Sequence, residues 1–249
     1  MSDSKTPTQG APPFLARTLV IIPALNEAAC IADTVRYWLR RGAAGVRVAD
    51  NGSTDDTAKL AAEAGAEVIR EPRRGYGAAC WTGLLSFPER LEWILFSSAD
   101  GSDQLSPEEA AAWQSVVDAG ADLVMGDRFS EPESRQHLKP VQRFGNRLCC
   151  ALIFLGWRTR FRDMASLRLL RKSAFDAMAL EDRGFGWNIE MQVRAVELGL
   201  HWVELPIAYH PRAAGESKIS GSFRGTLRAA RGMMAMTASL WLRKQRRRR

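Results

Sequence analysis

The sequence predicts an α/β protein built around a mostly parallel central sheet. Short apolar runs alternate with helix-length segments from residue 18 to about residue 125, the spacing typical of βαβ units. The first run, Thr18 to Ile22, is β-branched, apolar and ended by Pro23, as a buried parallel strand would be. At 249 residues the chain has room for one such domain and a tail.

The expected elements follow in order along the chain. Strands are predicted at 18–22, 45–49, 66–69, 92–97 and 122–125, with helices between them at 26–41, 53–64, 77–87 and 106–119. Ser53 or Thr54 is placed to cap the second helix. Beyond Arg128 the alternation loosens. A polar loop is expected at 130–140, helices at 144–155 and 187–198, and strands at 166–170 and 201–205.

The two ends of the chain differ from the middle. Residues 1–16 are rich in Ser, Thr, Pro and Ala and predict a disordered leader, not a signal peptide. Residues 17–222 form the predicted domain, and 223–249 a basic amphipathic helix with an arginine-rich tail. Apolar residues recur on this helix at helical spacing, beside a stripe of basic residues: Phe223, Leu227, Ala230, Met234, Thr237 and Trp241, and Arg224, Arg228 and Arg231. Two interpretations stand: the helix lies on an anionic bilayer, or it packs on the core with its arginines in solvent.

The composition argues against several classes of protein. A formal net charge of +7 favours anionic partners. The four cysteines form no CxxC pair, so a reducing, cytoplasmic compartment fits better than a disulfide framework or a zinc site. No stretch reaches the roughly 20 apolar residues of a membrane-spanning helix. His137, His201 and His210 are too isolated to suggest a catalytic pair, and the charge without interleaved aromatic residues does not predict nucleic-acid binding.

Four polar segments follow predicted strands, where ligands of open α/β sheets bind: 23–27, 50–57, 73–78 and 98–103. Asp50 is placed to accept hydrogen bonds from a base or ribose, or to serve as a turn or cap residue. Gly75 and Gly77 would let backbone N–H groups approach a diphosphate, or would only mark a turn. Asp100 and Asp103 carry the oxygen ligands that Mg²⁺ or Mn²⁺ prefers, although two acids also suit a loop near a helix start.

Taken together and in this order, the segments resemble glycosyltransferase family 2, whose GT-A fold is a Rossmann-like, mostly parallel sheet with flanking helices. The resemblance runs from about Thr18 to Ser222 and is closest to the polyprenyl-phosphate (dolichol-phosphate) mannose and glucose synthases and their bacterial relatives. The motifs that carry it are Val20 to Glu27, VADNGSTDDT at 48–57, Gly75-Tyr76-Gly77-Ala78, Gly126-Asp127-Arg128, the stretch 185–192, and Arg212 with GESKISG at 215–221.

The resemblance implies a UDP- or GDP-linked sugar as donor and Mg²⁺ or Mn²⁺ as cofactor. The residues expected to bind the nucleotide sugar are Pro23, Ala24, Asn26, Glu27, Asp50, Asn51, Arg74, Gly75 and Gly77. Asp100, with Ser102, matches positions that hold the metal. The family's usual Asp-Ala-Asp reads Ser98-Ala99-Asp100 here, so a neutral hydroxyl replaces one carboxylate. Metal affinity should therefore fall, unless Asp103 compensates or the metal is held mainly by Asp100 and the diphosphate.

The resemblance also implies transfer of the sugar to an acceptor, with a polyprenyl phosphate favoured. The expected catalytic residues are Asp100, Arg128, Arg212 and Lys218. Cationic and hydroxyl groups are candidates for holding an acceptor phosphate, unless they are plain surface groups: Arg128, Arg143, Arg168, Arg212, Ser217 and Lys218. A phosphate acceptor needs no general base, whereas a hydroxyl needs one, and Asp163 and Glu190 are the acids to test.

Two alternatives stay open at this point. One is a glycosyltransferase of the same fold that uses a hydroxyl or soluble acceptor. The other is a catalytically impaired nucleotide-sugar-binding protein, which Ser98 makes plausible. If the acceptor is a lipid phosphate, we expect the protein to lie peripherally at the inner face of the cytoplasmic membrane.

Overall fold

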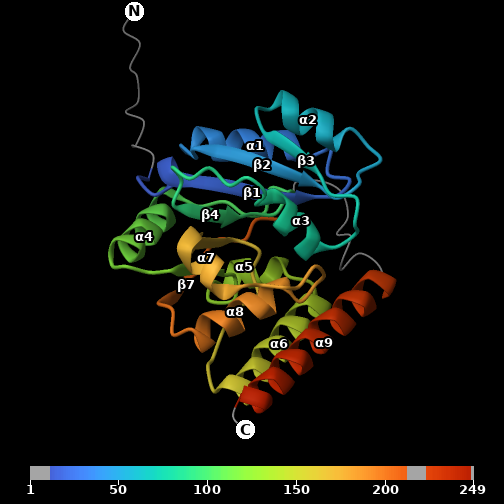
Figure 1. Ribbon diagram of the computed structural model, residues 1–249. Helices are drawn as coiled ribbons and strands as arrows, with labels where there is room; N and C mark the ends of the chain where they lie inside the picture. Colours follow the sequence, from blue (N-terminus) through green and yellow to red (C-terminus); the bar gives the residue numbers. More distant parts are fainter. Residues whose placement is uncertain (1–11, 212–222, 248–249) are drawn as a thin grey trace, which may run out of the picture.

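A computed structural model describes residues 12–211 and 223–247, and these contain a seven-stranded sheet (Figure 1). The strand order is β3-β2-β1-β4-β6-β5-β7. The strands are β1 Thr18–Ala24, β2 Gly45–Asp50, β3 Glu67–Arg70, β4 Trp93–Phe96, β5 Leu123–Asp127, β6 Arg168–Arg171 and β7 Trp202–Pro206. Strands β3, β2, β1 and β4 are parallel, and β7 is parallel to β5. The predicted mostly parallel sheet is therefore confirmed, with β6 antiparallel to both of its neighbours.

Helices cover both faces of this sheet (Figure 1). They are α1 Ile31–Arg40, α2 Thr57–Glu63, α3 Tyr76–Gly83, α4 Pro107–Asp118, α5 Pro132–His137, α6 Pro140–Trp157, α7 Lys172–Met178, α8 Trp187–Glu197 and α9 Phe223–Arg247. Because successive side chains of a strand point to opposite faces, β1 contributes to two cores. Val20 joins the cluster of Trp38 on α1 and Trp113 on α4, and Ile21 joins the cluster of Trp187 on α8.

Some expected elements are corrected by the structure. Helix α1 begins at Ile31 rather than at residue 26, because Asn26 has a left-handed backbone (φ 53°) and the chain turns there. The expected loop at 130–140 contains α5, whose first residue Pro132 suits a helix start, and α6 already begins at Pro140. Helix α7, directly after β6, was not predicted.

The N-terminal boundary also moves. Phe14 and Leu15 are fully buried, and a short 3₁₀ helix spans Leu15–Arg17. These two side chains pack in the same cluster as Trp38, so the leader cannot extend to residue 16. Residues 1–11 lie outside the described part of the chain.

Helix α9 lies along α6 and α8 (Figure 1). Leu240 and Thr237 are buried, the Cys149 thiol of α6 lies 3.5 Å from the Met233 sulfur, and Lys244 donates to the Gly156 carbonyl at 2.6 Å. One face of α9 therefore packs on the domain, as one of the two interpretations predicted. The side chains of 223–229 lie outside the described residues. None of the described helices is both long enough and apolar enough to cross a bilayer.

The segment before β6 is fixed by a buried ion pair. The Arg128 guanidinium at the end of β5 donates to both carboxylate oxygens of Asp163, each at 2.7 Å, and the Arg128 N–H donates at 3.0 Å. The Asp163 side chain is fully buried and that of Arg128 is 14% exposed. Burial alone would lower the pKa of Arg128, but the Asp163 carboxylate raises it, and the net shift is upward.

Three further side chains hold the same segment. Glu204 of β7 accepts from the N–H groups of Arg162 and Asp163, both at 3.0 Å. Asn146 of α6 donates to the Arg162 carbonyl and accepts from the Met164 N–H, at 2.8 and 2.7 Å. Gln192 of α8 donates to the Asp163 carbonyl at 3.0 Å. Residues 162–164 thus join the sheet to α6 and α8.

We predict that Asp163→Asn destabilises the protein by about 3–5 kcal/mol, because it keeps the side-chain shape but leaves the Arg128 charge buried and unpaired. Urea unfolding measures this directly. The control is Glu92→Gln, which breaks an ion pair with Arg17 whose two side chains are 46% and 48% exposed, and should cost less than about 1 kcal/mol. Equal losses in the two variants would contradict the role given to the buried pair.

Candidate active site

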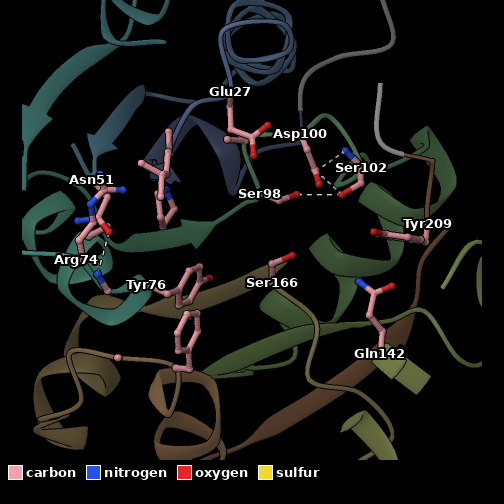
Figure 2. Close-up of a pocket in the computed structure, with 18 of the residues that line it drawn as sticks. Glu27, Asn51, Arg74, Tyr76, Ser98, Asp100, Ser102, Gln142, Ser166 and Tyr209 are labelled. Atoms are coloured by element: carbon pink, nitrogen blue, oxygen red, sulfur yellow. Dashed lines mark hydrogen bonds between the residues drawn. The ribbon is translucent and has the colours of Figure 1, made fainter. Parts of the chain in front are cut away.

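A pocket of about 470 Å³ opens at the carboxyl ends of β1, β2 and β4 (Figure 2). Residues from all four predicted polar segments line it. Residues from the second half of the chain also line the pocket. The full set is Pro23, Ala24, Leu25, Glu27, Asn51, Arg74, Gly75, Tyr76, Ala79, Ser98, Ala99, Asp100, Ser102, Arg128, Gln142, Ser166, Gly184, Phe185 and Tyr209. Figure 2 shows Asn51 and Arg74 at one end, Gln142 and Tyr209 at the other, and Ser98, Asp100 and Ser102 between them.

Asn51 organises the first end of the pocket. Its amide nitrogen donates to the carbonyls of Glu71 and Arg73 at 3.0 and 2.7 Å, and its amide oxygen accepts from the Gly75 N–H at 2.9 Å. The side chain that follows β2 therefore fixes the whole 71–75 loop, which carries Arg74 into the pocket lining.

Two residues expected to bind the nucleotide sugar lie behind this wall. Asp50 is buried, is not among the lining residues, and accepts from the Ser53 N–H at 3.1 Å. Asn26 likewise lies outside the lining, and its amide oxygen accepts from the Thr54 N–H at 2.8 Å. In this conformation both side chains brace the 50–57 loop.

The two glycines allow a close approach between chain segments. The Gly75 N–H donates to Asn51, and the Gly77 N–H donates to the Gly184 carbonyl at 2.9 Å. A Cβ on Gly75 would lie 2.2 Å from the Arg183 carbonyl oxygen, and one on Gly77 would lie 2.8 Å from the Asp182 carbonyl oxygen. The expectation that these N–H groups face a diphosphate is thus not met here, because both already have protein acceptors.

The middle of the pocket carries the oxygen ligands expected for a divalent ion. The Ser102 hydroxyl donates to an Asp100 carboxylate oxygen at 2.6 Å and lies 3.1 Å from the Ser98 hydroxyl. All three side chains line the pocket, which suits a hard cation that takes oxygen ligands and shares its coordination with substrate phosphates. The described residues contain no group of three His, Cys, Asp or Glu that could hold a metal alone.

Asp103 stands behind this group and does not line the pocket. Its Oδ2 accepts from the Ser98 N–H at 2.7 Å and from the Ser166 hydroxyl at 2.8 Å. Burial, with the nearby Asp100 charge, raises the pKa of Asp103. As placed, Asp103 positions the two serines, so it does not supply the carboxylate that Ser98 lacks.

The far end of the pocket is polar and largely uncharged. Ser166, Gln142 of α6 and Tyr209 line it together with Arg128, whose guanidinium carbon lies 5.3 Å from the centre of the Tyr209 ring. Arg128 is the one candidate for binding acceptor phosphate that the described part of the pocket contains, and two of the five N–H donors of its guanidinium are taken by Asp163.

The other acceptor candidates lie elsewhere. Arg143 donates to the Leu138 carbonyl at 2.9 Å and is not among the lining residues. Arg168 is fully buried and donates to the carbonyls of Ala165 and Asn188, and burial lowers its pKa to about 10. Arg212, Ser217 and Lys218 lie outside the described residues.

Neither acid proposed as a general base faces the pocket. Asp163 is paired with Arg128, and one carboxylate oxygen of Glu190 accepts from the N–H groups of Glu181 and Asp182 at 2.9 and 2.8 Å. Burial raises the pKa of Glu190. Its contacts hold the 181–186 segment against α3, and so place Gly184 and Phe185 in the pocket wall.

Sequence reasoning missed several lining residues. Gln142 follows no predicted strand, and the polar stretch 130–140 concealed the start of α6. Two signals for Tyr209 were available and not used: it follows the predicted strand 201–205, and it lies three residues before Arg212. Tyr76 and Phe185 lay inside quoted motifs without being assigned a role.

The comparisons with known proteins agree with the fold. Residues 19–180 match the family described as Glycosyl transferase family 2, and the chain belongs to this family. An uncharacterised glycosyltransferase of Mycobacterium tuberculosis H37Rv is 37% identical over 216 residues, which cover 84% of this chain and 92% of the relative. The polyprenol monophosphomannose synthase of Mycolicibacterium smegmatis is 30% identical, with 88% and 91% covered.

A solved structure shows the same GT-A fold. The glucosyl-3-phosphoglycerate synthase of Mycobacterium tuberculosis, in complex with Mn²⁺, UDP-glucose and phosphoglyceric acid, superimposes with a TM-score of 0.69. It is 20% identical, and the match covers 93% of this chain and 82% of that chain. The protein is therefore a glycosyltransferase on a GT-A fold.

We predict that Gly75→Ala weakens nucleotide binding by roughly tenfold or more, because the added methyl must push the 182–184 segment off α3 and open the pocket wall. Calorimetric titration with UDP and GDP measures the affinity. Gly145→Ala on α6 is the matched control, since its Cβ would meet nothing within 4 Å. An affinity of Gly75→Ala equal to that of Gly145→Ala would contradict this packing role.

We also predict that Ser98→Asp tightens Mn²⁺ binding in the presence of UDP by roughly tenfold, because it adds a carboxylate beside Asp100. The measurement is a Mn²⁺ titration followed by electron paramagnetic resonance. Ser115→Asp, on α4 and outside the pocket lining, controls for the added charge. Unchanged Mn²⁺ affinity in Ser98→Asp would show that this position does not face the ion.

Proposed function

We propose that the protein transfers a sugar from a UDP- or GDP-linked donor to a polyprenyl phosphate, at the inner face of the cytoplasmic membrane. The observation that carries the choice of acceptor is the small number of carboxylates in the described lining of the pocket. Among the described residues that line the pocket, Glu27 and Asp100 are the only carboxylates: Glu27 belongs to the expected nucleotide-sugar site, and Asp100 lies in the middle of the pocket with Ser98 and Ser102. A phosphate acceptor is already ionised near neutral pH, so it needs no group to remove a proton.

The donor end supports a nucleotide sugar. Pro23, Ala24, Glu27 and the Asn51-held loop with Arg74 form one wall of the pocket, and Asp100 with Ser98 and Ser102 forms the next. The related solved structure contains UDP-glucose and Mn²⁺, which makes a UDP-sugar and a divalent ion the first donor and cofactor to test. Asp100 and Ser102, with Ser98, would hold Mg²⁺ or Mn²⁺ together with the diphosphate.

When bound, the ion neutralises charge that develops on the departing diphosphate. The chain's own residues position the reactants. Asn51 holds the 71–75 loop against the donor, while Ser166, Gln142 and Tyr209 present neutral hydrogen-bonding groups to the acceptor end. Arg128 places a positive charge beside that end, and its pairing with Asp163 keeps the guanidinium in a fixed orientation. We propose that Arg212, Ser217 and Lys218 add donors for the acceptor phosphate.

A second candidate is transfer to a small soluble acceptor that carries a phosphate. The observation that favours it is the structural match to a synthase in complex with phosphoglyceric acid. The first candidate remains stronger, because a relative that matches 88% of this chain is a polyprenol monophosphomannose synthase.

The test is a transfer assay with purified protein, Mn²⁺ or Mg²⁺, and a panel of labelled UDP- and GDP-sugars. With polyprenyl phosphate present, we expect label to enter an organic-extractable product. Asp100→Ala should lower this transfer by roughly a hundredfold or more, because the ion loses its carboxylate ligand. Asp118→Ala, an exposed acid on α4, should leave the rate unchanged.

The alternatives give different results in the same assay. Label transferred only to phosphoglycerate or a similar soluble acceptor would identify the second candidate. Nucleotide binding without turnover, with activity restored by Ser98→Asp, would identify an impaired enzyme and overturn the proposal.

A further inference from the structure

Helix α6 has two apolar faces, of which one is exposed. Its inward face contributes Cys149 and Ile153 to the core. Its outward face carries apolar side chains three or four residues apart, which therefore form one stripe: Val141, Phe144, Leu148, Leu152 and Leu155. Phe144 and Leu155 are 68% and 65% exposed. A single exposed leucine needs no explanation, but a stripe along a whole helix does.

Helix α9 extends this surface. Met234, Trp241 and Leu242 are about half exposed. A groove of about 330 Å³ lies between the two helices, lined by Leu152, Leu155, Gly156 and Trp157 of α6 and by Met234, Thr237, Ala238 and Trp241 of α9. The two stripes are therefore one continuous apolar surface, which we call the α6–α9 face.

The charges on these helices have one sign. Over residues 140–157 and 223–247 the sequence contains no Asp or Glu. Arg147 of α6 and Arg231 and Arg246 of α9 are exposed, and Arg158 and Arg160 lie over the Phe154 ring at the end of α6, at 6.0 and 5.0 Å. A second copy of this chain would bring these cations against each other. An anionic surface with an apolar interior matches both the charge and the apolar stripe.

The same helix reaches the pocket. Gln142, between Val141 and Arg143 at the start of α6, lines the acceptor end of the pocket. Its neighbours Val141 and Phe144 begin the exposed stripe. One rigid helix therefore carries both the apolar surface and a wall of the site.

We propose that the α6–α9 face is a docking surface for an anionic bilayer, and that docking places the acceptor end of the pocket next to the lipid headgroups. The second half of this inference rests on the proposed lipid-phosphate acceptor, whereas the first half does not. Apolar side chains of the stripe enter the headgroup boundary, with Trp241 in the position that tryptophan favours at such boundaries. The flanking arginines contact lipid phosphates.

The test is sedimentation of the full chain with sucrose-loaded vesicles. We expect binding to phosphatidylcholine vesicles that contain roughly 30% of the anionic lipid phosphatidylglycerol, and at least about tenfold weaker binding to pure phosphatidylcholine. The double variant Phe144→Asp with Leu155→Asp should bind the anionic vesicles at least about tenfold more weakly. Leu85→Asp is the matched control, because Leu85 is 58% exposed and lies on neither helix. Unfolding midpoints should be the same in all variants.

Three outcomes overturn the inference. One is no binding of the unaltered chain to anionic vesicles, and another is equal binding by the double variant. The third is a concentration-dependent dimer that the double variant abolishes while vesicle binding stays unchanged, which would make a second copy the occupant.

A paired transfer assay separates this inference from the proposed function. With a short-chain lipid phosphate dissolved in detergent, the double variant should transfer sugar as fast as the unaltered chain, and it should be slow only with acceptor in vesicles. Vesicle docking without transfer to any acceptor would overturn the proposed function alone. Transfer in detergent without vesicle docking would overturn the docking surface alone.

Discussion

The buried ion pair between Arg128 and Asp163 is the contact on which the arrangement of the pocket depends. It connects the end of β5 to residues 162–164, which Glu204, Asn146 and Gln192 hold from β7, α6 and α8. Because that segment leads directly into β6, the pair also fixes Ser166 at the acceptor end. A buried charge pair contributes little net stability compared with apolar residues, but it tolerates only one geometry once the surrounding hydrogen bonds are made. Here the ion pair serves to fix the position of residues 162–164 relative to β5.

The same logic applies to the other buried acids around the site. Asp103 positions Ser98 and Ser166, Glu190 holds the 181–182 segment, and Glu204 holds residues 162–163. Burial raises the pKa of all three carboxyls, and in each of them hydrogen bonding from backbone N–H groups opposes this rise. These three acids thus shape the walls of the pocket without facing it. This leaves the acceptor end neutral or positive, which is compatible with an anionic acceptor.

Local patterns predicted the first half of the fold well, because β1 to β5 are apolar runs whose ends are marked in the sequence. The strand of β6 was predicted at 166–170, but its antiparallel direction and the helices α5 and α7 were not predictable, since pairing direction and short helices depend on distant contacts. For the site, strand ends indicated Glu27, Asn51, Ser98 and Asp100. The sequence could not show that Asp50 turns inward or that Asp163 is paired, because burial and partners are properties of the tertiary structure.

Helix α6 connects the α6–α9 face to the pocket as one rigid element. Its 18 residues span about 27 Å. Asn146 on the inward side holds the 162–164 segment, Gln142 lines the pocket, and Phe144 and Leu155 face outward. Any partner bound to the outward stripe is therefore held at a fixed height relative to Ser166 and Arg128. Because the helix is anchored on its inward side, it fixes the distance between the outward stripe and the pocket. An acceptor bound at that surface therefore meets a site whose geometry is already set.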